Sequence, residues 1–156
     1  MKPGTMWQKI RSIPSMFMSN PRRYKMAKIT PLEYFKAKLD ATISPVGLEA
    51  MQREAPTSFL LIDVRIGPVP TRIPWALIIP ETDIQKRMVD LPKDKLLVLY
   101  CWETWCSLAT KSAVPLLEAG YQVKELFGGI AAWETMGFPT VSGQEPPDEA
   151  PAFNIT

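Results

Sequence analysis

Three continuous apolar runs limit the folds open to this chain more than any other feature of its sequence. They occupy residues 59–62, 76–79 and 96–100, and none alternates between apolar and polar side chains. A strand has this composition when both of its faces are buried, as in a parallel sheet that helices cover on both sides. Helical patterns alternate with the strands, so we expect an α/β fold of three layers, with a mostly parallel central sheet flanked by helices.

Capping residues mark where several helices begin. Thr30-Pro31-Leu32-Glu33 combines an N-cap threonine, a proline at the first helical position and a glutamate three residues after the cap. Ser44-Pro45 repeats the cap and the proline, and Thr82-Asp83-Ile84-Gln85 repeats the capping box. Three prolines predict a loop over residues 66–75. The predicted elements are helices at 31–39, 45–54, 83–89, 107–119 and 129–133, and strands at 59–62, 76–79, 96–100 and 123–126.

Charge is distributed unevenly along the 156 residues, although the net charge is only +2. Residues 1–28 carry seven basic side chains and no acidic one, so the rest of the chain is acidic on balance. We expect a basic N-terminal extension at 1–28, one domain at 29–142, and a flexible, acidic, proline-rich tail at 143–156. The extension is either a loosely docked arm, a segment that binds an anionic surface or a partner, or an organellar transit peptide.

The chain contains no histidine and two cysteines. The missing imidazole excludes a Ser/His or Cys/His triad and removes the commonest metal ligand. Two cysteines alone cannot supply a structural zinc site, so we expect neither a metal nor another cofactor. They are also a poor disulfide framework, which favours a reduced, cytoplasmic setting, with organellar import or peripheral membrane association through residues 1–28 left open. No apolar stretch approaches the roughly 20 residues of a membrane span, and we expect no nucleic-acid partner.

Cys101 stands at the most informative position in the sequence. It follows the apolar run 96–100 and precedes the predicted helix 107–119. Functional sites of open parallel sheets lie beyond the carboxyl ends of the strands. The free N–H groups and the dipole of a helix N-terminus stabilise an anion and lower the pKa of a nearby thiol. We therefore expect Cys101 to be a thiolate nucleophile at neutral pH, and the alternative is a buried, inert cysteine.

Several short segments between residues 30 and 141 form a family signature. They are Leu61-Ile62-Asp63-Val64-Arg65, Ile73-Pro74-Trp75-Ala76 with Ile79-Pro80, Leu91-Pro92-Lys93-Asp94-Lys95, Val98-Leu99-Tyr100-Cys101, Ala119-Gly120-Tyr121-Gln122-Val123, and Gly128-Gly129-Ile130-Ala131-Ala132-Trp133. In order and spacing, these segments resemble a single-domain rhodanese, which is a sulfurtransferase. The resemblance implies a rhodanese-like fold and an enzyme that carries sulfane sulfur as a persulfide on Cys101. It also implies a small sulfur donor and a thiol, a cyanide-like compound or a protein as the acceptor.

The resemblance makes residues 101–107 the active-site loop, whose backbone N–H groups would surround the sulfur. The loop residues after Cys101 are Trp102, Glu103, Thr104, Trp105, Cys106 and Ser107. A Tyr-Cys-Trp opening with a second cysteine at this place is similar to one subgroup of single-domain rhodaneses. Cys106 is a candidate relay or resolving thiol, or a small side chain that supports the loop. Two alternative functions stay open: a thiol-redox protein that cycles Cys101 and Cys106, and a non-catalytic rhodanese-fold binding module.

Three further side chains are candidates to support the loop. Asp63 and Arg65 form either an acid/base pair or an ion pair that braces the site, and Arg65 could reach the donor. Lys111 is the nearest candidate for positive charge beyond the loop, or else a solvated surface lysine. A loop without a cation should bind the thiosulfate dianion weakly. Phosphatases that share this fold end a longer loop in an arginine, where this chain has Ser107, so we expect no phosphatase activity. Trp75 replaces a small glycine of the family and is expected to narrow or reshape the entrance.

Overall fold

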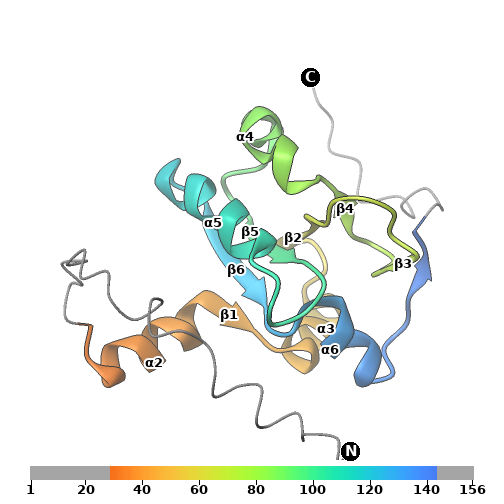
Figure 1. The fold of residues 1–156 in the computed structure, drawn as a ribbon, viewed down its shortest axis with the longest axis horizontal. Coiled ribbons are helices and arrows are strands. Elements are labelled where there is room, and N and C mark those ends of the chain that lie inside the picture. The colour runs from red at the N-terminus through yellow and green to blue at the C-terminus, as the bar shows by residue number, and fades with distance from the viewer. Residues whose placement is uncertain (1–28, 144–156) are drawn as a thin grey trace, which may run out of the picture. The chain divides into compact units, whose positions relative to one another are not determined.

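A central sheet organises the part of the chain that the computed structural model describes, residues 29–143 (Figure 1). The predicted extension at 1–28 and all but the first residue of the predicted tail at 143–156 lie outside these residues. The chain divides into two units, Met1–Tyr34 and Phe35–Thr156, and the sheet belongs to the second. Both cysteines therefore lie in the same unit as the sheet.

Five parallel strands form the main sheet within residues 29–143, in the order β1-β6-β5-β2-β4. Their bounds are β1 (Thr42–Ile43), β2 (Phe59–Asp63), β4 (Leu77–Ile78), β5 (Leu96–Tyr100) and β6 (Gln122–Leu126). The register pairs Asp63 of β2 with Tyr100 of β5, the last residue of each strand. The segments that begin at Val64 and Cys101 consequently leave the same edge of the sheet, and the predicted parallel architecture is confirmed.

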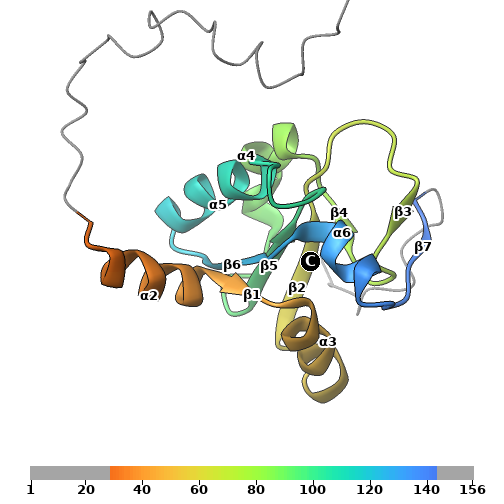
Figure 2. The ribbon, with the colours of Figure 1, turned by 60° about the horizontal axis from the view of Figure 1, so that its bottom comes forward.

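Helices cover both faces of this sheet, as predicted. Figure 2 shows α4 (Ile84–Arg87) and α5 (Leu108–Glu118) on one side and α3 (Pro45–Glu54) on the other, with α6 (Gly129–Thr135) beside β5 and β2. Successive residues of a strand point to opposite faces. Leu97 and Leu99 of β5 accordingly belong to the core under α5, whereas Val98 and Tyr100 belong to the core that contains Trp133 of α6. Two separate apolar cores thus hold β5 at the centre.

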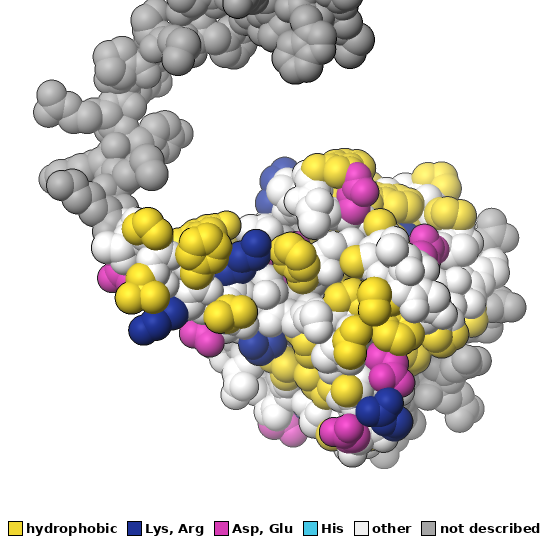
Figure 3. All heavy atoms as spheres, turned by 90° about the horizontal axis from the view of Figure 1, so that it is seen from below, with side chains coloured by type: hydrophobic (Ala, Val, Ile, Leu, Met, Phe, Trp, Pro, Cys, Tyr) yellow, Lys and Arg dark blue, Asp and Glu magenta, His cyan; other side chains and the backbone are white. Residues whose placement is uncertain are grey.

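Helix α2 (Pro31–Ala41) begins at the predicted capping box. The backbone N–H of Glu33 donates to the Thr30 hydroxyl at 3.2 Å, and the Thr30 N–H donates to the Glu33 carboxylate at 2.8 Å. No residue of α2 is buried, and Leu39 is 75% exposed. Figure 3 shows hydrophobic side chains exposed at the left of the molecule, where Figure 1 places α2.

Within residues 29–143, no helix has the length and apolar content needed to cross a bilayer.

The loop predicted over residues 66–75 is interrupted by a short strand. β3 (Thr71–Arg72) pairs antiparallel with β7 (Val141–Ser142) in a second, two-stranded sheet. Thr71 and Arg72 lie between two prolines and retain backbone N–H groups that can pair with another strand. Their partner is distant in sequence, so no local pattern reveals it. β1 and β7 are also too short for a periodic pattern, and no prediction covers them.

The helix predicted over residues 83–89 is shorter than expected. It starts as a 3₁₀ turn, η2 (Glu81–Asp83), continues as the single-turn α4, and ends in a second 3₁₀ turn, η3 (Met88–Asp90). Asp83, not Thr82, is the N-cap of α4, and its side chain makes no capping hydrogen bond. The Thr82–Gln85 capping box is therefore a wrong prediction, because the chain enters this helix through a tighter turn.

Replacing Leu99 with alanine should destabilise the protein by about 2–5 kcal/mol, since the side chain is fully buried and its removal leaves a cavity. Leu117→Ala is the matched control, because Leu117 is 53% exposed on α5 and should change the stability by no more than about 0.5 kcal/mol. Chemical denaturation measures both free energies of unfolding. Equal losses in the two variants would contradict the placement of β5 at the centre of the core.

Candidate active site

Two hydrogen bonds from the start of α6 orient the loop that joins β5 to α5. The N–H of Ile130 donates to the carbonyl of Cys101 at 3.0 Å, and the N–H of Ala131 donates to the carbonyl of Trp102 at 3.1 Å. In a planar trans peptide the C=O and the following N–H point in opposite directions. The N–H groups of Trp102 and Glu103 are therefore turned away from α6, and that of Trp102 faces the Cys106 sulfur.

Gly129 allows α6 to approach the loop this closely. Its φ is +58°, in the left-handed region, and a Cβ at this position would lie 2.5 Å from the carbonyl oxygen of Cys101. This Cβ would also lie 2.9 Å from the carbonyl carbon of Trp102. A larger residue would thus combine backbone strain with a collision against main-chain atoms that cannot move independently.

The two thiols meet inside this loop and are both free. Cys101 is 2% exposed, and its thiol donates to the carbonyl oxygen of Cys106 at 3.4 Å. The Cys106 sulfur lies close enough to Cys101 for the two thiols to influence each other's ionisation, and it accepts from the backbone N–H groups of Trp102 and Leu108. The backbone N–H of Ala109 faces the Cys101 sulfur. Leu108 and Ala109 are the first two residues of α5, whose N–H groups have no partner within the helix.

These contacts shift the pKa values of the two thiols in opposite directions. Burial is the main cause that raises the pKa of Cys101 to about 12; the Ala109 N–H opposes the rise, and the neighbouring Cys106 adds to it. Burial also opposes ionisation of Cys106, but the Leu108 N–H, the Cys101 thiol and the Trp102 N–H outweigh it and lower the pKa of Cys106. Burial and the neighbouring Cys106 thus oppose the expected thiolate form of Cys101 in this resting site. The loop amides and the helix N-terminus do stabilise a sulfur anion, but two of the three N–H groups reach the second cysteine.

Asp63 and Arg65 form a buried ion pair beneath the loop, one of the two predicted alternatives. The guanidinium donates from Nε to Oδ1 at 2.9 Å and from Nη2 to Oδ2 at 2.5 Å, and both side chains are 1% exposed. Burial opposes the charged form of Arg65, but the Asp63 carboxylate outweighs it and raises the Arg65 pKa. The Tyr100 hydroxyl donates to Asp63 at 2.9 Å, and burial is the main cause that raises the Tyr100 pKa.

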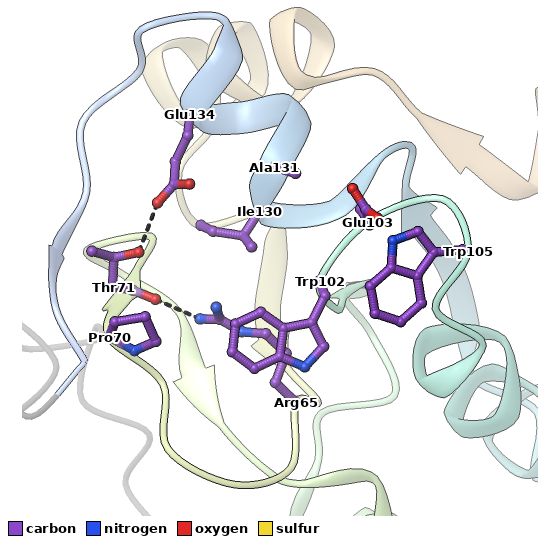
Figure 4. Close-up of a pocket in the computed structure, with 9 residues that line it drawn as sticks. All are labelled: Arg65, Pro70, Thr71, Trp102, Glu103, Trp105, Ile130, Ala131 and Glu134. Atoms are coloured by element: carbon purple, nitrogen blue, oxygen red, sulfur yellow. Dashed lines mark hydrogen bonds between the residues drawn. The ribbon is translucent and has the colours of Figure 1, made fainter. Parts of the chain in front are cut away.

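A pocket of about 480 Å³ opens on the α6 side of the loop (Figure 4). Its lining comes from the segment after β2, from the cysteine loop and from α6, and neither cysteine is among the described residues that line it. The lining residues are Arg65, Pro70, Thr71, Trp102, Glu103, Trp105, Ile130, Ala131 and Glu134. Arg65 also donates from Nη2 to the Thr71 carbonyl at 2.7 Å, which ties the floor of the pocket to β3.

The remaining predicted residues lie around the loop rather than in the pocket. Lys111 is exposed on α5, consistent with a surface lysine, and Thr104 is exposed at the loop tip. Ser107 is the N-cap of α5 but makes no side-chain capping bond. Trp75 does not narrow the pocket: it packs edge-on against Trp133 in the core, with 5.6 Å between ring centroids.

Glu125 is a site residue that the sequence analysis misses. It lies half-buried on β6, where burial raises its pKa although the Thr110 hydroxyl donates to it at 3.2 Å. Its negative charge opposes the ionisation of both thiols, although other contacts still leave the pKa of Cys106 lowered. No pattern in the sequence of β6 relates Glu125 to the cysteines, because the proximity arises from strand pairing.

Across residues 29–143, no three Asp, Glu, Cys or His side chains gather as a metal site.

Comparison with known proteins identifies the family. The profile of the rhodanese-like domain matches residues 44–136, more than half of the chain, and the chain belongs to the rhodanese-like domain family. A sulfurtransferase of Allochromatium vinosum is 37% identical over 95 residues, which are 58% of this chain and 87% of that protein. The crystal structure of a full-length protein from Lactobacillus plantarum matches with a TM-score of 0.67 and 26% identity, over 71% of this chain and 95% of that chain.

A second relative has a different architecture. An HTH-type transcriptional regulator of Mycobacterium tuberculosis is 30% identical over 97 residues, which are 61% of this chain but 43% of the regulator. The chain thus spans less than half the length of that relative. The match covers one part of the regulator, and the activity of the whole regulator does not transfer to this chain.

Replacing Gly129 with alanine should destabilise the protein and distort the loop. We expect a loss of about 1–2 kcal/mol for the positive φ and about 1–3 kcal/mol more for the collision with the Cys101–Trp102 peptide. Gly137→Ala is the matched control, because Gly137 has a φ of +72° and a Cβ there would meet no atom of residues 29–143 within 4 Å. Chemical denaturation compares the two variants, and equal losses would show that the close contact with α6 is unimportant.

Alkylation should distinguish the two thiols. Iodoacetamide reacts with thiolates, so near neutral pH it should modify Cys106 before Cys101, as fragment-ion mass spectrometry can locate. In the variant Cys106→Ala, the alkylation of Cys101 should follow a pKa below about 12, because the neighbour that raises it is gone. Faster modification of Cys101 in the unaltered protein would contradict the assigned acidities.

Proposed function

We propose that this protein is a sulfurtransferase that carries sulfane sulfur as a persulfide on Cys101. Membership of the rhodanese-like family and the similarity to a sulfurtransferase support the class of reaction. Cys101 follows β5 directly, at the sheet edge where such folds hold their sites. The single observation that carries the mechanism is the hydrogen bond from the Cys101 thiol to the Cys106 carbonyl at 3.4 Å, which places the second cysteine beside the first inside the loop.

In the first step, Cys106 takes the place of the missing histidine. The Cys101 thiol, which donates to the Cys106 carbonyl in the resting site, turns its proton to the neighbouring Cys106 thiolate, which accepts it. The Cys101 sulfur attacks the outer sulfur of a donor X–S⁻, a new S–S bond forms, and X leaves with the electron pair of the X–S bond. Because the pKa of Cys101 is the higher one, the proton transfer is uphill and is completed as bond formation consumes the Cys101 thiolate.

In the second step, the sulfur leaves and the proton returns. A thiolate or cyanide acceptor attacks the outer sulfur of the Cys101 persulfide, and the Cys101 thiolate is the leaving group. It recovers its proton from Cys106, so the site regains its resting state with no net oxidation. The N–H groups of the loop stabilise the negative sulfur at each stage, in the manner of an oxyanion hole.

The contact between the sulfurs also favours a second candidate function, a thiol-redox cycle. The Cys106 thiolate attacks the inner sulfur of a Cys101 persulfide, a Cys101–Cys106 disulfide forms, and hydrosulfide leaves. This reaction oxidises both cysteines and reduces the carried sulfur, so a reductant must restore the site. It produces a different mass change from sulfur transfer, which makes the two functions separable.

Mass spectrometry after incubation with polysulfide, mercaptopyruvate or thiosulfate tests the proposal. The unaltered protein and Cys106→Ser should gain the mass of one sulfur atom and lose it on addition of cyanide. Cys101→Ser should gain none, because the carrier is absent. Cys106→Ser should load at least about tenfold more slowly near neutral pH, since the internal proton acceptor is gone.

Three other results would each contradict persulfide carriage on Cys101. Sulfur retained in Cys101→Ser but lost in Cys106→Ser would make Cys106 the carrier. The loss of two hydrogens without any gain of sulfur, dependent on both cysteines, would favour the redox cycle. No change in mass with any donor would favour a non-catalytic binding module.

A further inference from the structure

The floor of the pocket beside the loop carries a donor without a partner. Arg65 uses Nε and Nη2 for Asp63 and Thr71, but its Nη1 has no hydrogen-bond partner among the described residues. Figure 4 shows the guanidinium at the pocket floor beside Trp102. A buried N–H group that donates no hydrogen bond is unfavourable. An oxygen acceptor in the pocket would therefore satisfy a donor that has no hydration of its own to lose.

The charges around the pocket select the kind of acceptor. Asp63 already neutralises Arg65, while Glu103 and Glu134 add two carboxylates to the lining. A dianion such as thiosulfate would meet more negative than positive charge here. A ligand with one carboxylate and one ammonium matches both features, since the first reaches Nη1 of Arg65 and the second faces the glutamates.

The aromatic walls suit the same ligand. The Trp102 ring lies over the Arg65 guanidinium, 4.6 Å from its central carbon, and the Trp105 side chain stands 72% exposed at the pocket. Indole faces attract an ammonium group and also cover the apolar part of a small ligand. Glu134 accepts a hydrogen bond from the Thr71 hydroxyl at 2.7 Å, which holds its carboxylate at the rim.

The pocket and the thiols share the backbone of the loop. Trp102 lines the pocket with its side chain, while its N–H donates to the Cys106 sulfur. Ala131 lines the same pocket and holds the Trp102 carbonyl. A ligand seated here is thus in contact with the residues that orient the sulfur site.

We propose that this pocket recognises a sulfur-bearing α-amino acid, of the class of cysteine and its persulfide. Its carboxylate accepts from Nη1 of Arg65, and its ammonium group faces Glu134 and Glu103. This inference rests on the proposed function, because it names the class of sulfur substrate that the same site takes.

The test uses S-methyl-L-cysteine, a thioether with no thiol and no transferable sulfur, and the full chain. NMR follows the indole N–H signals of Trp102 and Trp105, and saturable shifts of these two are expected at millimolar probe. Two analogues each lack one charge: N-acetyl-S-methyl-L-cysteine has no ammonium, and the methyl ester has no carboxylate. Each should bind about fivefold more weakly, and thiosulfate should not compete.

Two variants locate the binding. Glu134→Gln keeps an oxygen for the Thr71 hydroxyl and should weaken the probe about threefold to tenfold without weakening the N-acetyl analogue. Arg65→Lys removes Nη1 and should weaken the probe about fivefold, to the affinity of the methyl ester. Arg53→Lys, at a 62% exposed position, should not change the affinity. If Arg65→Lys does not fold, as denaturation would reveal, the contrast between probe and analogue in Glu134→Gln decides the question.

Equal affinity for the probe and its two analogues, or no saturable shift, would overturn the inference. Competition by thiosulfate would do the same. Because the probe cannot donate sulfur, its binding reports on the pocket alone. Polysulfide loading of the unaltered protein reports on Cys101 alone, so failure of this inference and failure of the proposed function are distinguishable.

Discussion

The hydrogen bonds from the start of α6 to the carbonyls of Cys101 and Trp102 are the constraint on which the site depends. They fix two peptide planes, and planarity then dictates where the opposite N–H groups point. Gly129 permits the contact because a Cβ would meet the loop backbone. The first turn of α5 supplies further N–H groups from the other side. The sulfurs are thus held by main-chain atoms of three segments that the sheet brings to one edge.

A second network joins the sheet to the pocket. Asp63 ends β2 and Tyr100 ends β5, and both meet Arg65 within a region closed to solvent. Arg65 also reaches the Thr71 carbonyl, which couples β3 to the strand ends. Removing one partner of such a buried pair leaves an uncompensated charge and costs about 3–5 kcal/mol. The same arginine therefore braces the fold and lines the floor of the pocket.

Much of this architecture can be predicted from the sequence, because local physics determines it. The buried run at 96–100 matches β5, and Ser44-Pro45 marks the first residue of α3. β3 cannot be predicted in this way, since its pairing with β7 depends on contacts distant in the chain. The environments of the two cysteines cannot be told apart from the sequence for a similar reason. The sequence indicates that amides would stabilise a thiolate, but only the folded loop determines that Cys106 receives two of the three.

The use of main-chain donors has an evolutionary consequence. A side-chain base can be lost by a single substitution, whereas every residue except proline carries the same N–H group. The loop can therefore exchange Glu103, Thr104 or Trp105 and adapt the surface offered to other molecules while its anion-holding interior persists. Sequence divergence in this loop would reshape recognition long before it erased the capacity to hold a negative sulfur.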